Sequence, residues 1–327
     1  MRAAWYDRQG AATEVLRVGE LPDPEPAAGE VRVRVHVSGV NPGDTKKRAG
    51  YFGSAMPFPR VVPHSDGAGV VDRVGDRVDP ARVGRRVWVS GAQSYRASGT
   101  AAEYTVVPSE LAVDLPDGVS DEIGASLGIP GVTAHRCVFA DGPVSGATVL
   151  VHGVLGGVGS LAAALATWGG ATVIGTVRRT GELADVPAAL AGRAVALDVP
   201  DPAAAIRAVA PGGVDRIVEV ALAANADLDD AVIAEHGAIA AYATNEARTA
   251  IPFWTLLFKN VTIRLCGSDD FPAEARARAA ADLTTVAALG ALPIRTAPAY
   301  ALADVAAAHD AVDAGARRGR VLVDLTR

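Results

Sequence analysis

The stretch A-T-V-L-V-H-G-V-L-G-G-V-G, residues 147–159, decides the fold of this chain. Its first half is a continuous apolar run, which is typical of a β-strand that is covered on both faces. A glycine-rich turn follows, and apolar residues then recur at helical spacing, at Val158, Leu161, Ala162 and Leu165. A strand, a glycine-rich turn and a helix in this order predict a dinucleotide-binding unit.

The turn itself predicts a site for a diphosphate. Glycines let the backbone approach the anion, while free N–H groups and the helix dipole favour negative charge at the helix start. A further glycine, Gly159, lets the helix pack closely. We therefore expect cofactor contacts from Gly156, Gly157, Val158 and Gly159, against the alternative of a glycine-rich turn without a ligand.

The next apolar strand, residues 171–177, ends on Arg178 and Arg179. An NAD site places an acid there for the adenosine ribose, whereas a guanidinium binds a 2′-phosphate in a bidentate manner. The pair therefore favours NADPH, and Thr176 is counted with it as a cofactor contact. The alternative is two solvated arginines on a loop.

Strands and helices are distributed unevenly along the chain. In residues 30–39, valines alternate with polar residues, which predicts a strand with one buried face. With further short strands and Gly/Pro turns, among them N-P-G-D at 41–44, the first third predicts a small barrel or sandwich. After about residue 123, strands alternate with helices, which predicts a parallel sheet. The remaining predicted strands are at 85–90, 102–107, 193–198, 214–220, 238–243 and 320–325, and the remaining helices at 202–210, 226–235, 272–289 and 303–314.

Length, charge and cysteine content exclude several classes of protein. The 327 residues indicate roughly two domains. The net charge of −6 argues against nucleic-acid binding, and no apolar run is long enough to span a membrane. Nothing at the N-terminus marks the chain for export, so we expect a cytoplasmic protein. The only two cysteines, Cys137 and Cys266, exclude a disulfide scaffold and are interpreted as packing residues.

Five motifs in order carry a family resemblance. They are N-P-G-D-T-K-K-R-A-G-Y at 41–51, P-H-S-D-G-A-G-V-V at 63–71, L-G-I-P-G-V-T-A-H-R at 127–136, the glycine-rich turn, and I-V-E-V-A-L-A-A-N at 217–225. Together they resemble zinc-independent quinone oxidoreductases of the zeta-crystallin type, a branch of the medium-chain dehydrogenase/reductase superfamily.

The resemblance implies an α/β protein with two domains and an active site between them. A GroES-like β-barrel catalytic domain would occupy 1–122, completed by 268–327, and a Rossmann domain with a doubly wound parallel sheet would occupy 123–267. The implied activity is NADPH-dependent, metal-free hydride transfer to a quinone or an α,β-unsaturated carbonyl, in a homodimer. The alternatives are a dedicated enone or enoyl reductase of a biosynthetic pathway and a non-catalytic NADPH-binding sensor.

Zinc alcohol dehydrogenases are the sister group, and their metal ligands are missing here. Asn41 stands where they carry a cysteine, and Ser65–Asp66 stands where they carry a His–Glu pair. His64 lies one position early, so its side chain points elsewhere. We therefore expect no metal, and hence an acceptor that takes hydride without a Lewis acid.

The resemblance also implies roles for individual residues. Tyr51, Asn41 and Asp44 match substrate-site positions, although a packed aromatic ring and ordinary turn formers are the alternatives. The sequence departs from the family at Lys46, where a tyrosine is usual. His152 is interpreted as structural rather than as a general base. The remaining expected cofactor contacts are Thr133, Asn225, Ala243, Thr244, Cys266, Gly267, Ser268 and Arg320.

Overall fold

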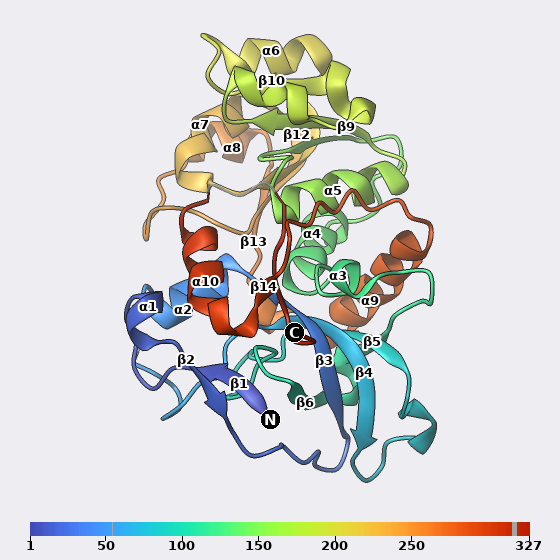
Figure 1. Cartoon of the computed structure of the whole chain (residues 1–327). Helices are drawn as coiled ribbons and strands as arrows, with labels where there is room; N and C mark the ends of the chain where they lie inside the picture. Colours follow the sequence, from blue (N-terminus) through green and yellow to red (C-terminus); the bar gives the residue numbers. More distant parts are fainter. Residues whose placement is uncertain (54, 316–318) are drawn as a thin grey trace. The chain divides into compact units, whose positions relative to one another are not determined.

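The computed structural model describes residues 1–53, 55–315 and 319–327 (Figure 1). The chain forms two compact units. Unit 1 consists of Met1–Pro130, Ala280–Gly290 and Ile294–Arg327, and unit 2 of Gly131–Ala279 and Ala291–Pro293. The domain limits expected from the sequence, 1–122 with 268–327 and 123–267, stay a prediction. Among the residues that the structure describes, no helix has both the length and the apolar composition needed to cross a membrane.

Unit 2 is built on a six-stranded sheet in which every neighbouring pair is parallel. The strand order is β10-β9-β8-β11-β12-β13. This order places β8 next to β11 at the point where the winding direction reverses, as in a doubly wound sheet. The predicted fold class is therefore confirmed. The strands are β8 (Thr148–Val151), β9 (Thr172–Val177), β10 (Ala194–Ala196), β11 (Val214–Glu219), β12 (Ile233–Ala241) and β13 (Thr262–Leu265).

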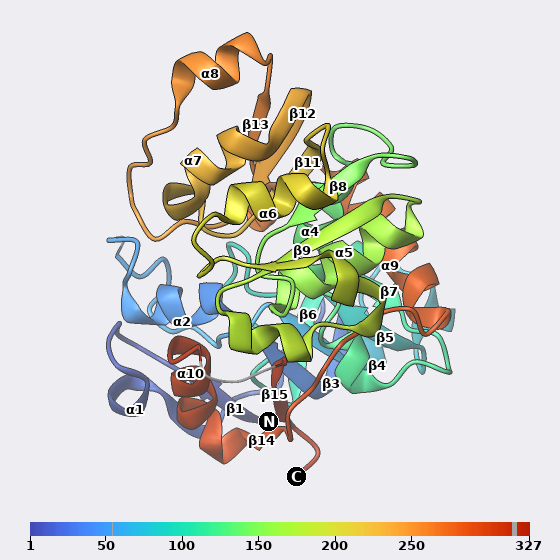
Figure 2. The same ribbon diagram turned by 90° about the horizontal axis from the view of Figure 1, so that it is seen from above.

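Helices cover both faces of this sheet (Figure 2). On one face, α6, α7 and α8 pack against the strands through a buried apolar cluster that includes Leu150, Ile174 and Ile217. Figure 2 shows α4 and α5 on the other face. The helices are α4 (Ile129–Phe139, starting at the end of unit 1), α5 (Gly157–Trp168), α6 (Pro202–Val209), α7 (Leu222–Val232) and α8 (Phe253–Phe258).

Unit 1 is built on a largely antiparallel sheet whose central strand is β3 (Glu30–Val40). The order is β14-β15-β3-β4-β5-β7, and β6 also pairs with β3. The valines of β3 that alternate in the sequence are buried, as the period-two pattern predicts. The other strands are β4 (Asp66–Val74), β5 (Arg86–Val89), β6 (Tyr104–Pro108), β7 (Ala112–Asp114), β14 (Tyr300–Ala301) and β15 (Val321–Asp324), with a separate pair, β1 (Arg2–Trp5) and β2 (Arg17–Glu20).

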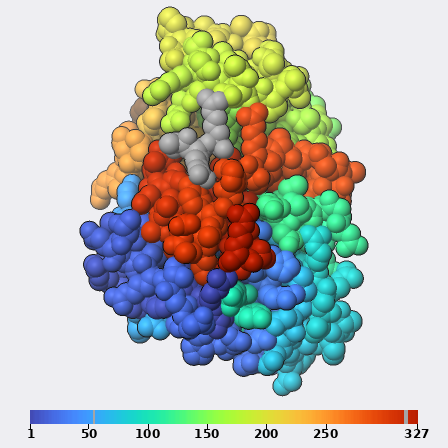
Figure 3. All heavy atoms as spheres, in the orientation of Figure 1, coloured from blue at the N-terminus to red at the C-terminus, as the bar shows by residue number. Residues whose placement is uncertain are grey.

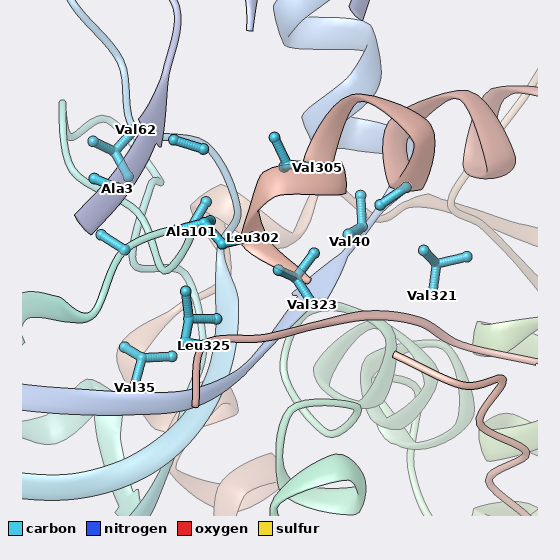
Figure 4. Packing of buried hydrophobic residues seen from close by; sticks show 13 residues of the cluster. Ala3, Val35, Val40, Val62, Ala101, Leu302, Val305, Val321, Val323 and Leu325 are labelled. Carbon is cyan, nitrogen blue, oxygen red and sulfur yellow. The ribbon is translucent and has the colours of Figure 1, made fainter. Parts of the chain in front are cut away.

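The C-terminal segment completes the core of unit 1. Figure 3 shows it packed beside N-terminal residues, and β15 pairs antiparallel with β3. The close-up in Figure 4 shows Val35 and Val40 of β3 in one cluster with Leu302, Val305 and Val323. The helices of this unit are α1 (Ala12–Val15), α2 (Pro42–Ala49), α3 (Asp121–Gly124) and α10 (Val305–Asp313), while α9 (Ala273–Ala288) starts in unit 2 and ends in unit 1.

Two elements differ from the sequence-based expectation. Residues 41–44 begin the helix α2 instead of forming a turn only, because Pro42 fits the first helical position and the Asp44 carboxylate accepts the Asn41 N–H at 2.7 Å. The helix expected at 226–235 ends earlier, since the chain is extended at Ile233 and continues directly into β12. Alanine-rich sequence gives little periodicity from which to locate that boundary.

A pair of buried histidines lies in unit 1. His64 Nε2 and His309 Nε2 are 2.9 Å apart, so one ring donates to the other, and His64 Nδ1 is 2.8 Å from Ser38 Oγ. Burial lowers the pKa of His64, and burial with the nearby Arg48 guanidinium lowers the pKa of His309 to about 3. Both rings are therefore neutral in the folded protein near neutral pH.

We predict that His309→Gln makes the protein less sensitive to mild acid. Because the folded-state pKa of His309 lies below the unfolded-state value, the unfolded chain binds more protons, and stability falls as pH falls from about 6.5 towards 3. Removing this group should make the loss of unfolding free energy between pH 7.5 and 5.5 smaller by about 1.4 kcal/mol. Urea denaturation at the two pH values measures it.

Two comparisons make this measurement specific. Asp44, whose pKa is raised to about 7, acts in the opposite direction, but it is present in both proteins and cancels. His236 is exposed with a φ of 61°, which asparagine tolerates, so His236→Asn is the control and should keep the wild-type acid sensitivity. Equal acid sensitivity of wild type and His309→Gln would contradict the prediction.

Candidate functional site

The parallel sheet of unit 2 gathers the expected cofactor contacts at one edge. Val151, the last residue of β8, is in register with Gly175 of β9 and Val218 of β11, and Ala241 of β12 is in register with Leu265 of β13. The carboxyl ends of these strands therefore lie side by side, which is where open α/β sheets bind ligands.

The glycine-rich turn lies at the middle of this edge. Gly153 turns the chain with a left-handed φ of 65°, and Gly156 is the N-cap of α5. A Cβ at Gly159 would lie 2.2 Å from the carbonyl oxygen of Gly153, so α5 reaches the turn only because residue 159 has no side chain. The helix thus begins directly at the turn, with its first N–H groups at the ligand edge.

The other expected contacts of unit 2 lie on α4 and α7 and in the segments that follow β12 and β13. Thr133 is buried on α4. Asn225 is buried on α7, and its amide donates to both Glu219 oxygens at 3.1 Å. After β12, the Ala243 carbonyl accepts the Leu222 N–H at 3.3 Å. The remaining residues follow β12 and β13 in sequence: Thr244, Cys266, Gly267 and Ser268.

Arg178 and Arg179 follow β9, and both are exposed, with 78% of the Arg178 side chain accessible. Sequence reasoning missed the acid that shapes their turn. Glu182 accepts the backbone N–H groups of Arg178 at 3.0 Å and of Arg179 at 3.3 Å, and lies 3.8 Å from the Arg178 guanidinium. Glu182 lies four residues after Arg178 and three after Arg179, and this spacing was the sequence signal for a capped turn.

A buried network lies beneath the glycine-rich turn. The His152 ring is 3.0 Å from Thr176 Oγ1 through Nδ1 and 3.0 Å from Asp229 Oδ1 through Nε2, with Glu219 at 3.5 Å. Thr176 Oγ1 also accepts the Gly153 N–H at 3.3 Å. Burial alone lowers the pKa of His152, but the Asp229 hydrogen bond and the two carboxylate charges outweigh it, and the pKa is raised. His152 thus holds Thr176 and, through it, the turn.

Three residues of this network, His152, Glu219 and Asp229, form the one cluster of potential metal ligands among the described residues. One ligand atom each of His152, Glu219 and Asp229 lies within 4.8 Å of the others. Metal binding needs a neutral imidazole, whereas these contacts favour the protonated ring. The arrangement therefore fits a proton-sharing network better than a metal centre.

Unit 1 holds a second polar cluster, formed by Asn41, Asp66 and Arg320. Arg320 Nη1 donates to Asn41 Oδ1 at 2.8 Å, and Arg320 Nη2 lies 3.4 Å from Asp66 Oδ2. Asn41 Nδ2 donates to the same Asp66 oxygen at 2.7 Å. All three side chains are buried. The structure thus brings the expected residues Asn41 and Arg320 together on Asp66, which sequence reasoning did not select as a site residue.

Asp44 and Tyr51 lie at the two ends of α2. Asp44 is buried, and burial with the nearby Asp66 carboxylate raises its pKa to about 7. Tyr51 is 59% exposed. Lys46, where the family usually has a tyrosine, places its ammonium 4.9 Å from the centroid of the Tyr51 ring, a cation–π contact.

Zinc does not fit the residues of this cluster. Amide and carboxylate oxygens replace the thiolate and the imidazole that zinc prefers. Moreover, Arg320 already supplies a positive charge to Asp66 and a donor to Asn41. A cation at this position would compete with a buried guanidinium that is held by two partners.

We predict that Gly159→Ala weakens dinucleotide binding at least tenfold and destabilises the protein. The added Cβ would overlap a backbone oxygen, which cannot move without deforming the turn, and overpacking of this kind costs about 1–3 kcal/mol. Fluorescence titration and thermal unfolding measure the two effects. Gly212→Ala, where a Cβ meets nothing within 4 Å, is the matched control. Unchanged binding by Gly159→Ala would contradict the prediction.

Two protein-family models match the chain. The model described as "Alcohol dehydrogenase GroES-like domain" matches residues 27–117, and the model described as "Zinc-binding dehydrogenase" matches residues 157–282. The first match lies within unit 1, and the second begins in the glycine-rich turn of unit 2.

Individual relatives agree with these models. Human quinone oxidoreductase is 37% identical over 165 residues, which are 50% of this chain and 49% of that protein. The chain thus aligns with about half the length of this curated relative. A mycobacterial protein solved with NADPH is 29% identical, with a TM-score of 0.83 over 99% of this chain and 100% of that one. An NAD-dependent alcohol dehydrogenase is 27% identical, with a TM-score of 0.87 over 99% and 100%. The resemblance of this chain to the zinc-independent quinone oxidoreductases of the medium-chain dehydrogenase/reductase superfamily is confirmed.

Proposed function

We propose that this protein is an NADPH-dependent oxidoreductase that transfers hydride to a quinone or an α,β-unsaturated carbonyl. The observation that carries the proposal is the glycine-rich turn at the start of α5, with two exposed guanidiniums at the end of the neighbouring strand β9. Quinone oxidoreductase and NADPH in the names of similar proteins support the same activity and cofactor.

Bound NADPH would supply the hydride. The turn and the first N–H groups of α5 bind the diphosphate, and the Arg178 and Arg179 side chains bind the 2′-phosphate. Quinones and enones suit a site without a Lewis acid, because the negative charge that arrives with hydride delocalises onto oxygen. The protein then has to orient the acceptor and donate hydrogen bonds to it.

Unit 1 supplies the groups for the acceptor. The exposed Tyr51 hydroxyl donates to the acceptor oxygen, and the adjacent Lys46 ammonium favours an acceptor that becomes or already is negatively charged. Asn41 and Asp44 are proposed to line the same site, and Asp44, with a pKa of about 7, exchanges a proton near neutral pH. These roles rest on the sequence resemblance and on the chemistry of each group.

Two other functions are alternatives to this proposal. A dedicated enone or enoyl reductase would use the same residues with a narrow acceptor range. A non-catalytic NADPH sensor would bind the cofactor without turnover. An acceptor panel containing a benzoquinone, a naphthoquinone and an alkyl vinyl ketone distinguishes these three functions. The proposed oxidoreductase should turn over several of the acceptors, a dedicated reductase only one, and a sensor none.

We predict that Arg178→Ala/Arg179→Ala raises KM for NADPH at least tenfold and leaves KM for NADH nearly unchanged. Only NADPH carries the 2′-phosphate that the two guanidiniums contact, and charge-assisted hydrogen bonds contribute about 1.5–3 kcal/mol each. Steady-state kinetics with the best acceptor of the panel measure both constants.

The control for this variant is Arg207→Ala, which removes an exposed arginine from α6 in the same unit. It should leave both constants unchanged, and it reports any effect of net charge alone. Equal increases for NADPH and NADH in the double variant would overturn the assignment of the 2′-phosphate site.

We also propose that the protein forms a homodimer through β13 and α8. The strand β13 is the last in the sheet order, so within the described residues its outer edge has no strand partner. Beside it, α8 exposes Phe253, Trp254 and Phe258, the last at 76%. An open edge flanked by apolar side chains is self-complementary, and pairing with a second copy about a twofold axis would cover both.

We predict that Phe258→Glu converts a dimer into a monomer, because it places a carboxylate in the apolar part of the contact. Size-exclusion chromatography with light scattering measures the mass. Leu289→Glu changes a similarly exposed leucine, 67% accessible, in unit 1 and should leave the mass unchanged. A wild-type protein that elutes as a monomer would refute this part of the proposal.

A further inference from the structure

The carboxylate of Glu182 lies against the two arginines to which the 2′-phosphate is assigned. Glu182 belongs to the short 3₁₀ helix η3 (Thr180–Asp185), which begins just after β9. Its oxygen Oε2 accepts the backbone N–H groups of Arg178 at 3.0 Å and of Arg179 at 3.3 Å. The other oxygen, Oε1, lies 3.8 Å from Nη2 of Arg178. All three contacts of this carboxylate therefore go to the arginine pair.

These contacts make Glu182 the occupant of an anion site. Backbone N–H groups and a guanidinium are donors of the kind that also bind phosphate oxygens. The Glu182 side chain is held among them with 23% of its surface accessible, whereas 78% of the Arg178 side chain is accessible. Within the part of the chain that the structure describes, no other acid lies within ion-pairing distance of Arg178. A phosphate that approaches Arg178 thus meets a guanidinium that already faces a carboxylate.

A second acid holds the same turn independently of Glu182. Asp198 follows β10, the parallel neighbour of β9. Its oxygen Oδ1 accepts the Thr180 N–H at 2.9 Å and the Thr180 hydroxyl at 2.7 Å. The turn therefore keeps a tether when the charge of Glu182 is removed, so the effect of that charge can be measured on a folded protein.

The charge of Glu182 acts differently on the two nicotinamide dinucleotides. NADPH carries a phosphate of about −1.5 to −2 charges on the adenosine ribose, whereas NADH carries a hydroxyl there. A carboxylate repels the phosphate and competes with it for donors, but it can accept a hydrogen bond from a ribose hydroxyl. Because water and salt screen exposed charges, we expect an effect of about three- to tenfold in affinity.

We propose that Glu182 determines the cofactor preference of this protein, because its carboxylate competes with the 2′-phosphate of NADPH for Arg178 and the neighbouring N–H groups. This inference rests on the proposed function, which assigns the 2′-phosphate to Arg178 and Arg179. The two arginines favour NADPH, and Glu182 reduces that preference. The sequence-based choice of NADPH counted only the arginines and did not include this opposing charge.

The experiment compares the binding of NADPH and NADH, measured by fluorescence titration without an acceptor. Glu182→Gln keeps an oxygen for the two N–H groups and removes the charge. The ratio of Kd for NADH to Kd for NADPH should rise about three- to tenfold. Glu182→Ala also vacates the N–H groups and should raise this ratio at least as much. A general loosening of the turn would weaken both dinucleotides alike and would not raise the ratio.

Two controls test that the effect is electrostatic and local. Asp215 is an exposed acid that accepts the N–H of Thr148, the first residue of β8, at 2.7 Å, so it lies at the opposite end of the strands. Asp215→Asn removes one charge from a similar contact and should leave the ratio unchanged. In about 1 M salt, where the Debye length is about 3 Å, the rise in the Glu182 variants should shrink.

An unchanged or lower ratio in either folded Glu182 variant would overturn the proposal. An equal rise for Asp215→Asn, or a rise that persists undiminished in high salt, would do the same. The double variant Arg178→Ala/Arg179→Ala distinguishes this failure from failure of the proposed function. If it weakens NADPH binding while Glu182→Gln changes nothing, only the role of Glu182 is refuted. If it leaves NADPH binding unchanged, the 2′-phosphate site itself is refuted, and the inference falls with it.

Discussion

The dinucleotide site depends on the close approach of α5 to the turn after β8. Gly153 reverses the chain with a left-handed φ, and Gly159 lets the first turn of α5 lie against the Gly153 carbonyl. Any side chain at 159 would push the helix away, and the free N–H groups of its first turn would no longer lie at the strand edge. The absence of a Cβ at residue 159 is therefore what allows this backbone geometry and, with it, anion binding at the start of α5.

Buried side chains hold this turn in place. Thr176 on β9 accepts the Gly153 N–H, and His152 holds Thr176 from below. The imidazole is in turn held by Asp229 and Glu219, which are fully buried carboxylates. A buried charge is stable only with partners of this kind. The network thus fixes the turn before any dinucleotide arrives, so less ordering accompanies binding.

Local signals account for the parts of the fold that the sequence predicts. A pattern within about ten residues is enough to predict each of three elements: the β8–turn–α5 unit, the strand β3 with its alternating valines, and the C-terminal strand β15. The Asn41–Pro42 signal is also local, but the same residue types occur in turns and at helix starts. The sequence therefore did not distinguish a turn from the start of α2.

Contacts between distant residues could not be predicted in this way. The ion pair between Asp66 and Arg320 joins positions 254 apart. This pairing does not follow from periodicity or spacing, because it depends on which strands become neighbours. The expected site residues lie at plausible places, but their roles in binding and catalysis stay predictions.

The polar cluster of unit 1 bears on the kind of acceptor that the proposed function assigns to this protein. A guanidinium has no empty orbital and cannot bind a substrate oxygen as zinc does, so it cannot lower the barrier of a saturated alcohol or ketone by direct coordination. Arg320 instead places its positive charge against Asp66 and Asn41, and burial lowers the pKa of this guanidinium. What this cluster offers is a fixed orientation of the Asn41 amide at the start of α2. Under the proposed function, an acceptor whose own conjugation carries the arriving charge would need no metal beside this cluster.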